Sequence, residues 1–368
     1  MKSLVKISAV LAFVALTAYA PAVAPPALTA ASGPQMQSVG PLSFGPNGVL
    51  LAADPIGATI FALDLGAQAT GGAPGTANVT GLDQKIAALL GTEAKDITIV
   101  DLAVDQRSKN TIVAVMRGQG PSAKPALVRV DGAGKLTVIS TDSVQYTSVT
   151  LPNPPAPGGE GRANQRAQSV TQVRFANGKV WASGVSNEEF ASKLWSVAYP
   201  FSKADGGTSL EIYHDNHQRL ETRAPMYAFM PYTLDNQPYI IGAYTCTPLV
   251  KFPVSQLTAN SGSKFRGTTI GELGAGNRPI DMILYKKAGK DFILMANTSR
   301  GVMKIPTETF AAATPLTMPS NQETAGVPFE KIPAMQNVVQ LDLLDATHGV
   351  VLQGAQGQPL NLQSVDLP

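Results

Sequence analysis

The chain has 368 residues, of which 15% are charged and 44% are hydrophobic, and it contains 34 glycines, 28 prolines and a single cysteine. This composition is typical of a loop-rich β protein, and one cysteine excludes an intramolecular disulfide. The 28 basic and 26 acidic residues leave the chain close to neutral, which argues against a nucleic-acid-binding protein with its strongly basic surface.

Residues 1–31 have the pattern of a secretory signal peptide. Lys2 and Lys6 precede an apolar run from Ile7 to Tyr19, and small residues and prolines follow it. The run is shorter than the roughly 20 residues that span a bilayer. We therefore expect a periplasmic or secreted protein without a stable membrane anchor, whose single folded domain covers residues 32–368.

A pattern of apolar run, short polar turn and second apolar run recurs six times along the rest of the chain, at intervals of roughly sixty residues. The strand pairs predicted from it are Leu42–Asp54, Asp101–Arg117, Gln172–Gly184, Phe229–Thr245, Asp281–Met295 and Leu341–Gly354. A third strand is predicted after each pair, at Thr59–Leu65, Ala126–Asp131, Lys193–Ala198, Pro248–Val254, Val302–Ile305 and Pro359–Val365.

A three-stranded unit with one apolar face is not stable alone in water, so each copy must pack against others. Repeated small meanders of this length predict an all-β protein, a six-bladed β-propeller. The irregular region from Phe201 to Pro225 leaves seven blades as the alternative.

The last copy ends after its third strand, which would leave the edge of a sheet unpaired. We expect the start of the mature chain, Gln35 to Leu42, to add a strand there and close the ring. One short helix is also predicted, from a capping-box-like start at Thr80 and Asp83 to its end at Gly91.

The innermost strand of each propeller blade lines a central channel, so the heads of these strands converge on one mouth. Asp101, Gln172, Asp281 and Asp342 fall at that position. Three carboxylates and an amide suit Ca²⁺. The alternative interpretation is that each side chain caps its strand or bonds the backbone of the neighbouring blade.

Loops bring other polar side chains to the same mouth. His214 and His217 precede the fourth inner strand, and Cys246 follows the second strand of that blade, so imidazole and thiolate groups there would favour zinc or copper. Exposed loop histidines and a buried, apolar cysteine are the alternative. The other residues predicted on this ligand-binding face are Arg117, Gln172, Asn187, Asn277, Arg278, Asn297 and Arg300.

This six-copy meander, which covers most of the mature chain, resembles the six-bladed propellers of the SMP-30/gluconolactonase and strictosidine-synthase-like groups and, more loosely, the YVTN and NHL repeat proteins. The resemblance implies a divalent cation at one channel mouth, a role that Asp101, Asp281 and Asp342 would fill. The sequence itself has no Gly-x-Ser-x-Gly elbow, Walker loop or Cys-x-x-Cys-His haem motif.

We therefore expect an exported binding module that presents one loop-rich face to a small ligand, a metal ion or a protein partner. The alternative is a metal-dependent hydrolase of the lactonase or esterase type. In that case a cation at the channel mouth would polarise the substrate carbonyl, and His214 or His217 would be the candidate base.

Overall fold

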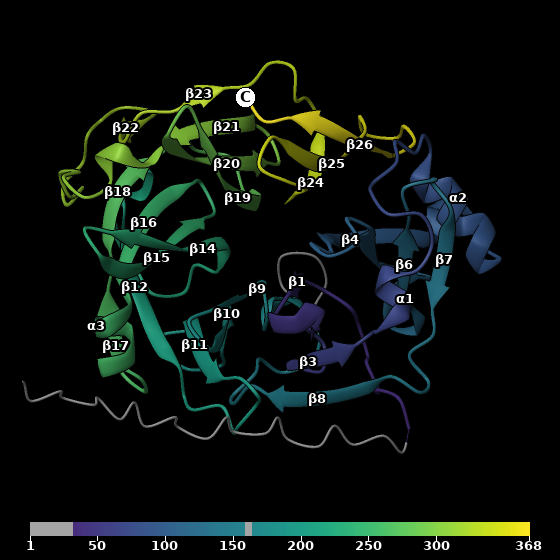
Figure 1. Ribbon diagram of the computed structural model, residues 1–368. Helices are drawn as coiled ribbons and strands as arrows, with labels where there is room; N and C mark the ends of the chain where they lie inside the picture. The colour runs from purple at the N-terminus through teal and green to yellow at the C-terminus, as the bar shows by residue number, and fades with distance from the viewer. Residues whose placement is uncertain (1–31, 159–163) are drawn as a thin grey trace, which may run out of the picture.

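The computed structural model describes residues 32–158 and 164–368, and it is a six-bladed β-propeller with its blades standing around a common axis (Figure 1). The six-bladed fold predicted from the repeats is confirmed. The predicted signal peptide, residues 1–31, lies outside the described residues.

Each predicted strand pair and third strand is present, and a fourth strand completes five of the blades. Blade 1 contains β1 (Leu42–Phe44), β2 (Leu50–Asp54), β3 (Thr59–Asp64) and β8 (Gln145–Thr150). Blade 2 contains β4 (Ile97–Val104), β5 (Thr111–Arg117), β6 (Lys124–Val130) and β7 (Leu136–Ile139). Blade 3 contains β9 (Gln172–Ala176), β10 (Lys179–Val185), β11 (Ser192–Ala198) and β12 (Thr208–His214), with β13 (Arg219–Glu221) and β17 (Lys264–Arg266) beside β12.

Blade 4 contains β14 (Met226–Leu234), β15 (Gln237–Tyr244), β16 (Pro248–Pro253), β18 (Thr268–Glu272) and β22 (Ala325–Gly326). Blade 5 contains β19 (Pro279–Lys287), β20 (Lys290–Asn297), β21 (Gly301–Pro306) and β23 (Glu330–Lys331). Blade 6 contains β24 (Val338–Leu343), β25 (His348–Gln353) and β26 (Asn361–Asp366). The region from Phe201 to Pro225 supplies β12 and β13 to the outer part of blade 3, so it is not a seventh blade.

The blades do not follow chain order around the ring. The inner strand β4 of blade 2 packs between β24 of the last blade and β1 of the first, and β1 in turn packs against β9 of blade 3 (Figure 1). After blade 2 the chain returns to pair β8 with β3 and complete blade 1. Blade 2 is therefore inserted between the two ends of the repeat array.

The prediction that Gln35–Leu42 adds a strand to the last blade is wrong. Leu42 begins β1, which pairs with β2 of its own blade. Because blade 2 and not blade 1 stands beside the last blade, the connection into blade 2 covers the free edge of β26. Val79 and Leu362 exchange two backbone hydrogen bonds of 2.9 Å, and the Leu82 N–H donates to the Leu360 carbonyl.

The predicted short helix is α2 (Leu82–Leu90), and its end at Gly91 is confirmed by the left-handed conformation of that glycine. The capping box does not form, since Gly81 occupies the N-cap position. Asp83 instead accepts a hydrogen bond of 2.9 Å from the Leu360 N–H. Two other short helices are present, α1 (Ala67–Thr70) and α3 (Val254–Ala259). In the described residues, no helix is both long and apolar enough to cross a membrane.

Six hydrophobic clusters hold the ring together, one at each boundary between neighbouring blades. Successive side chains of a strand point to opposite faces, so each blade serves two clusters. In β2, Leu50 and Ala52 face blade 2, whereas Leu51 and Ala53 face blade 3. This two-sided burial explains why the strands read as continuous apolar runs in the sequence.

The Asp83→Ala substitution tests the closure of the ring by α2. It removes the acceptor of the Leu360 N–H and leaves that half-buried group unpaired, so we expect the free energy of unfolding to fall by about 1–2 kcal/mol. Chemical denaturation measures this change. Gln84→Ala, on the exposed side of the same turn, is the control and should cost nothing. Equal stabilities of the Asp83→Ala and Gln84→Ala variants would contradict the proposed role of Asp83.

Candidate functional site

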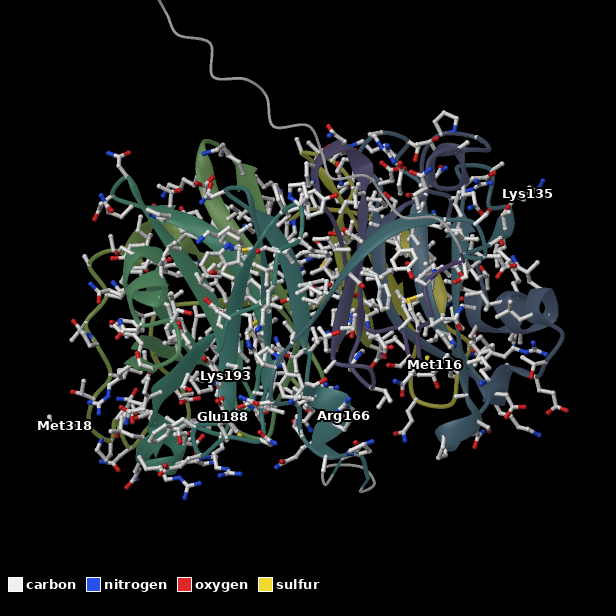
Figure 2. The ribbon with its side chains drawn as sticks, turned by 90° about the horizontal axis from the view of Figure 1, so that it is seen from below. Met116, Lys135, Arg166, Glu188, Lys193 and Met318 are labelled. Atoms are coloured by element: carbon white, nitrogen blue, oxygen red, sulfur yellow. The ribbon has the colours of Figure 1, made fainter. Side chains whose placement is uncertain are left out.

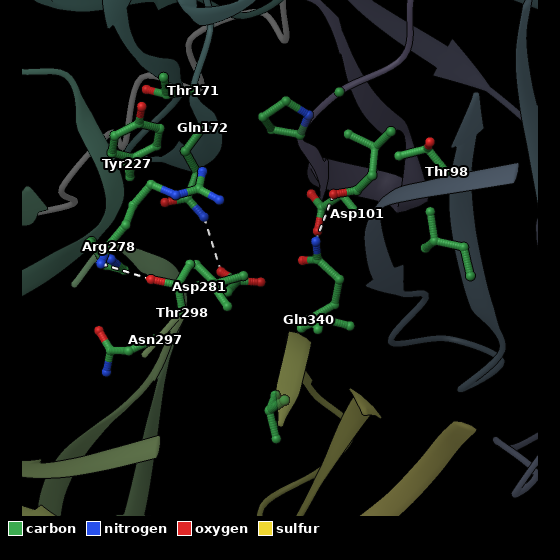
Figure 3. Close-up of a pocket in the computed structure, with 18 of the residues that line it drawn as sticks. Thr98, Asp101, Thr171, Gln172, Tyr227, Arg278, Asp281, Asn297, Thr298 and Gln340 are labelled. Atoms are coloured by element: carbon green, nitrogen blue, oxygen red, sulfur yellow. Dashed lines mark hydrogen bonds between the residues drawn. The ribbon is translucent and has the colours of Figure 1, made fainter. Parts of the chain in front are cut away.

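The axial mouth holds a cavity of about 970 Å³ to which all six blades contribute. Its wall includes the heads of the inner strands, the segment from Ser38 to Pro41 that precedes β1, and turns between second and third strands. Figure 3 shows several of these side chains converging on the open space from different blades. Of the four strand-head residues predicted at this mouth, Asp101, Gln172 and Asp281 line the cavity, whereas Asp342 does not.

Four inner strands carry an extra, unpaired residue at the same place near this mouth. The register of β4, β14, β19 and β24 against their second strands skips one residue there. A β-bulge of this kind turns a side chain out of the regular alternation. The four bulged residues all line the cavity, and they are Val100, Tyr227, Ile280 and Val339.

The bulges also shift the positions that are equivalent between blades. Asp101 and Asp281 each follow a bulge directly, and their counterpart in the last blade is Gln340 rather than Asp342. Asp342 lies two residues further along β24. Counting residues back from the second strand could not reveal this shift, because the sequence does not show that Val339 is an extra residue without a partner on β25.

Asp101 and Asp342 bond the backbone of the neighbouring blade. Asp101 accepts a hydrogen bond of 2.6 Å from the Leu42 N–H of blade 1, and Asp342 accepts one of 2.7 Å from the Val104 N–H of blade 2. Gln172 does the same in blade 3, where its Oε1 accepts a bond of 2.6 Å from the Phe229 N–H. These contacts are those of the alternative interpretation of the strand-head residues.

Asp281 meets a buried cation that the sequence did not point to. Its Oδ1 accepts bonds from Arg174 Nη2 at 2.8 Å, Gln172 Nε2 at 3.1 Å and the Met282 N–H at 2.8 Å. Arg174 lies in the middle of β9, where a long side chain reads as an exposed residue. The Arg174 guanidinium supplies a positive charge that acts on the carboxylates of Asp101, Asp281 and Asp342.

Burial governs the protonation of this group. It raises the pKa of Asp281 to about 6 despite the opposing charge of Arg174. Burial and the charge of Asp281 also raise the pKa of Asp101 well above its ordinary value, and burial raises the pKa of Asp342. Burial would lower the pKa of Arg174, but the carboxylates outweigh it and raise the pKa.

A second cluster lies where blades 3 and 4 meet. His214 ends β12, His217 ends the short 3-10 turn Asp215–His217, and Cys246 lies in the turn between β15 and β16. Their ligand atoms all lie within 4.8 Å of one another, and the centroids of the two imidazole rings are 3.8 Å apart. Within the described part of the chain, these three residues form the one group of this kind that could hold a metal ion.

Glu221 in β13 orients both histidines. Its Oε2 lies 2.9 Å from Nδ1 of His214, and its Oε1 lies 2.7 Å from Nδ1 of His217. Burial would raise the pKa of Glu221, but the bonds from the two histidines and Arg219 lower it to about 2. A carboxylate acceptor holds the proton of each ring on Nδ1, which leaves both Nε2 atoms available as ligands.

His214 presents an unused nitrogen to the interior. Its side chain is 1% exposed, and its Nε2 has no hydrogen-bond partner among the described residues. The nearest acidic group is Glu272, whose Oε2 lies 4.0 Å from that nitrogen. Burial raises the pKa of Glu272 to about 8, so this carboxyl is mostly protonated at neutral pH.

The remaining residues predicted on the face divide into three groups. Arg278 and Asn297 line the axial cavity together with Gln172. Asn277 is 3% exposed and donates from Nδ2 to Asn297 Oδ1 at 2.9 Å, so it shapes the loop from within. Like Asn277, three more residues do not line the cavity, and they are Arg117 and Asn187, which are exposed, and Arg300, which pairs with Glu323 at 2.6 Å.

Figure 2 shows the ring from its edge and places Met116, Arg166, Glu188 and Lys193 toward the same side. Met116 lines the cavity. Arg166 donates from Nε to the Ile56 carbonyl at 2.7 Å, which fixes the segment before β9 against blade 1 beside the cavity.

No protein-family model matches the sequence, and no curated protein matches it. Solved structures with a similar fold include the first two extracellular domains of Drosophila semaphorin 1b, at 11% identity and a TM-score of 0.42, covering 92% of this chain and 85% of that one. The PQQ-bound aldose sugar dehydrogenase of Streptomyces coelicolor has 12% identity and a TM-score of 0.32, covering 93% and 99%. Neither similarity assigns an activity to this chain.

The raised pKa of Asp281 predicts how stability depends on pH. Between its ordinary pKa of 3.8 and about 6, the folded state binds the proton more tightly than the unfolded state does. The contribution of Asp281 to the free energy of unfolding should therefore fall as pH rises through this window, by on the order of 3 kcal/mol. Chemical denaturation of the wild type and Asp281→Asn across the window measures the difference.

The exposed Asp142 provides a surface control in the Asp142→Asn variant. The wild type should lose stability relative to Asp281→Asn as pH rises. A difference that is constant, or that grows in favour of the wild type, would show that Asp281 is not held in a protonation-favouring site.

Proposed function

We propose that this protein is an exported binding module whose loop-rich face holds one zinc or copper ion at His214, His217 and Cys246. The observation that carries the proposal is the geometry of that cluster. Two imidazoles from blade 3 and a thiol from blade 4 come within 4.8 Å of one another, and the buried Nε2 of His214 has no described partner. An unpaired buried nitrogen is costly unless something binds it.

The spacing of the three ligand atoms suits a transition metal after a small closing movement. Metal–ligand bonds of about 2.0–2.3 Å place tetrahedral ligand atoms roughly 3.3–3.8 Å apart, about 1 Å closer than the widest spacing seen here. His217 is 42% exposed and lies on a short turn, so it can supply this movement. Imidazole and thiolate ligands select zinc or copper over calcium.

Glu221 completes the arrangement expected of a metal site. Histidine ligands commonly donate their second ring N–H to a carboxylate, which fixes the ring orientation and increases the basicity of the ligating nitrogen. Here one carboxylate serves both rings through its two oxygens. Three protein ligands leave a fourth coordination position for water or for a group from a binding partner.

Metal titration of the mature protein tests the proposal. We expect one equivalent of Zn²⁺, or of Cu⁺ under reducing conditions, to bind the wild type. His217→Ala and Cys246→Ala should each weaken binding at least about 100-fold, because each removes a ligand. His348→Ala is the matched control, since His348 is also 42% exposed and bonded to a carboxylate, but lies in the last blade.

Melting temperatures of all variants establish that they are folded. Binding of neither metal by the wild type would overturn the proposal. So would unchanged affinity in both ligand variants.

Glu221→Gln tests the orienting role separately. A glutamine amide has one acceptor and one donor group, so one histidine would have to accept at Nδ1 and carry its proton on Nε2. That nitrogen would then be lost as a ligand, and we expect metal affinity to fall by about 10–100-fold. Glu189→Gln, at an exposed position nearby in the sequence, should leave the affinity unchanged. Equal affinities in both variants would contradict the role given to Glu221.

A further inference from the structure

The axial cavity is a second site, distinct from the cluster of His214, His217 and Cys246, and none of those three residues lines it. Its volume of about 970 Å³ lies at the upper end of the usual range for small-molecule sites, roughly 300–1,000 Å³. Blades from both ends of the chain form its wall, so the closed ring fixes its shape.

Neutral hydrogen-bonding groups dominate the cavity wall. The side chains of Thr98, Gln168 and Gln356 make no hydrogen bond to a described residue, so their polar groups are available to a ligand. The amides on this wall include Gln168, Gln336, Asn337, Gln340 and Gln356. Amides offer a donor and an acceptor side by side, which matches the hydroxyl groups of a polyol.

Apolar surface is interleaved with these amides. The bulged residues Val100, Ile280 and Val339 face the cavity, and so does the ring of Tyr227. The guanidinium of Arg278 lies 4.8 Å from the centre of that ring. Figure 3 shows Tyr227 and Arg278 together on one side of the open space. A sugar presents C–H groups on its faces and hydroxyls around its edge, so a wall of this mixed kind fits both.

The charges of the wall are mixed and partly neutralised. Asp101 and Asp281 are its acidic residues and Arg278 its basic one, while Arg174 pairs with Asp281 behind the wall. A phosphate group would meet two carboxylates against one exposed guanidinium. A polyvalent cation would meet the guanidinium of Arg174 beside Asp281. Neither charged class is favoured over a neutral ligand.

We propose that the axial cavity binds a neutral, hydroxyl-rich small molecule, namely a saccharide of one to three units. Gln168 and Gln356 are positioned to bond its hydroxyls, and so is Oε1 of Gln340, whose Nε2 already donates to the Val100 carbonyl at 2.7 Å. Tyr227 is positioned to pack against a sugar face. Asp281 Oδ2 is an open carboxylate acceptor at the cavity wall, since the three bonds of that carboxylate to described residues fall on Oδ1.

Saturation-transfer NMR on the mature protein tests this proposal. The probes are glucose, galactose, xylose, arabinose, maltose and cellobiose, with inorganic phosphate, citrate and spermidine as charged comparisons. At least one sugar should bind and the charged compounds should not. Tyr227→Ala and Gln168→Ala should each weaken that binding about 10-fold or more, as expected when a stacking surface or a ligand hydrogen bond is lost.

Lys331→Ala, in a neighbouring hollow outside the cavity, is the matched control and should bind like the wild type. If Tyr227→Ala lowers the melting temperature, Gln168→Ala alone decides. Binding of no sugar, binding of a charged compound in place of sugars, or sugar binding that is equal in all variants would overturn the proposal. Measurements before and after chelator treatment separate this outcome from the metal proposal, because the cavity does not use the metal ligands.

Discussion

The structure depends on the burial of every blade on both faces. Leu50 and Leu51 are successive residues of one strand, and each is completely buried, but against different neighbouring blades. No blade of this kind can stand at an open end, because one apolar face would meet water. The ring must therefore close, and blade 2 closes it by lying between the last blade and the first. The segment from Asn78 to Asp83 then covers the remaining edge of the last blade.

Closure of the ring also positions the loops that carry the two candidate sites. Loops that are far apart in the sequence are held at fixed positions on one face, since the strands that carry them belong to a packed ring. The turn of Cys246 shows how the two sites are joined. The Cys246 N–H donates to the Asn277 carbonyl at 2.6 Å, and the Asn277 side chain donates to Asn297, which lines the axial cavity. A ligand at either site thus contacts loops that are bonded to the other.

The strands were predictable because a strand that is buried on both faces is apolar at successive positions, so it stands out as a continuous apolar run between turn residues. The Asn177-Gly178 turn, with φ of 51° and 73°, is such a marker. The order of the blades around the ring was not predictable, because the repeats have similar patterns and nothing in those patterns indicates which blade packs against which. The meeting of His214 and His217 with Cys246 followed from loop directions alone. The partnership of Glu221 with both histidines did not, because it depends on how β13 folds back along β12. Arg174 gave no signal either, as a lone arginine in a strand is usually exposed.

X-ray absorption spectroscopy at the metal edge of the zinc- or copper-loaded protein tests the central claim most directly. Two imidazole nitrogens and one sulfur in the coordination shell are expected if His214, His217 and Cys246 hold the ion. A shell made only of oxygen atoms, or one without sulfur, would contradict the account.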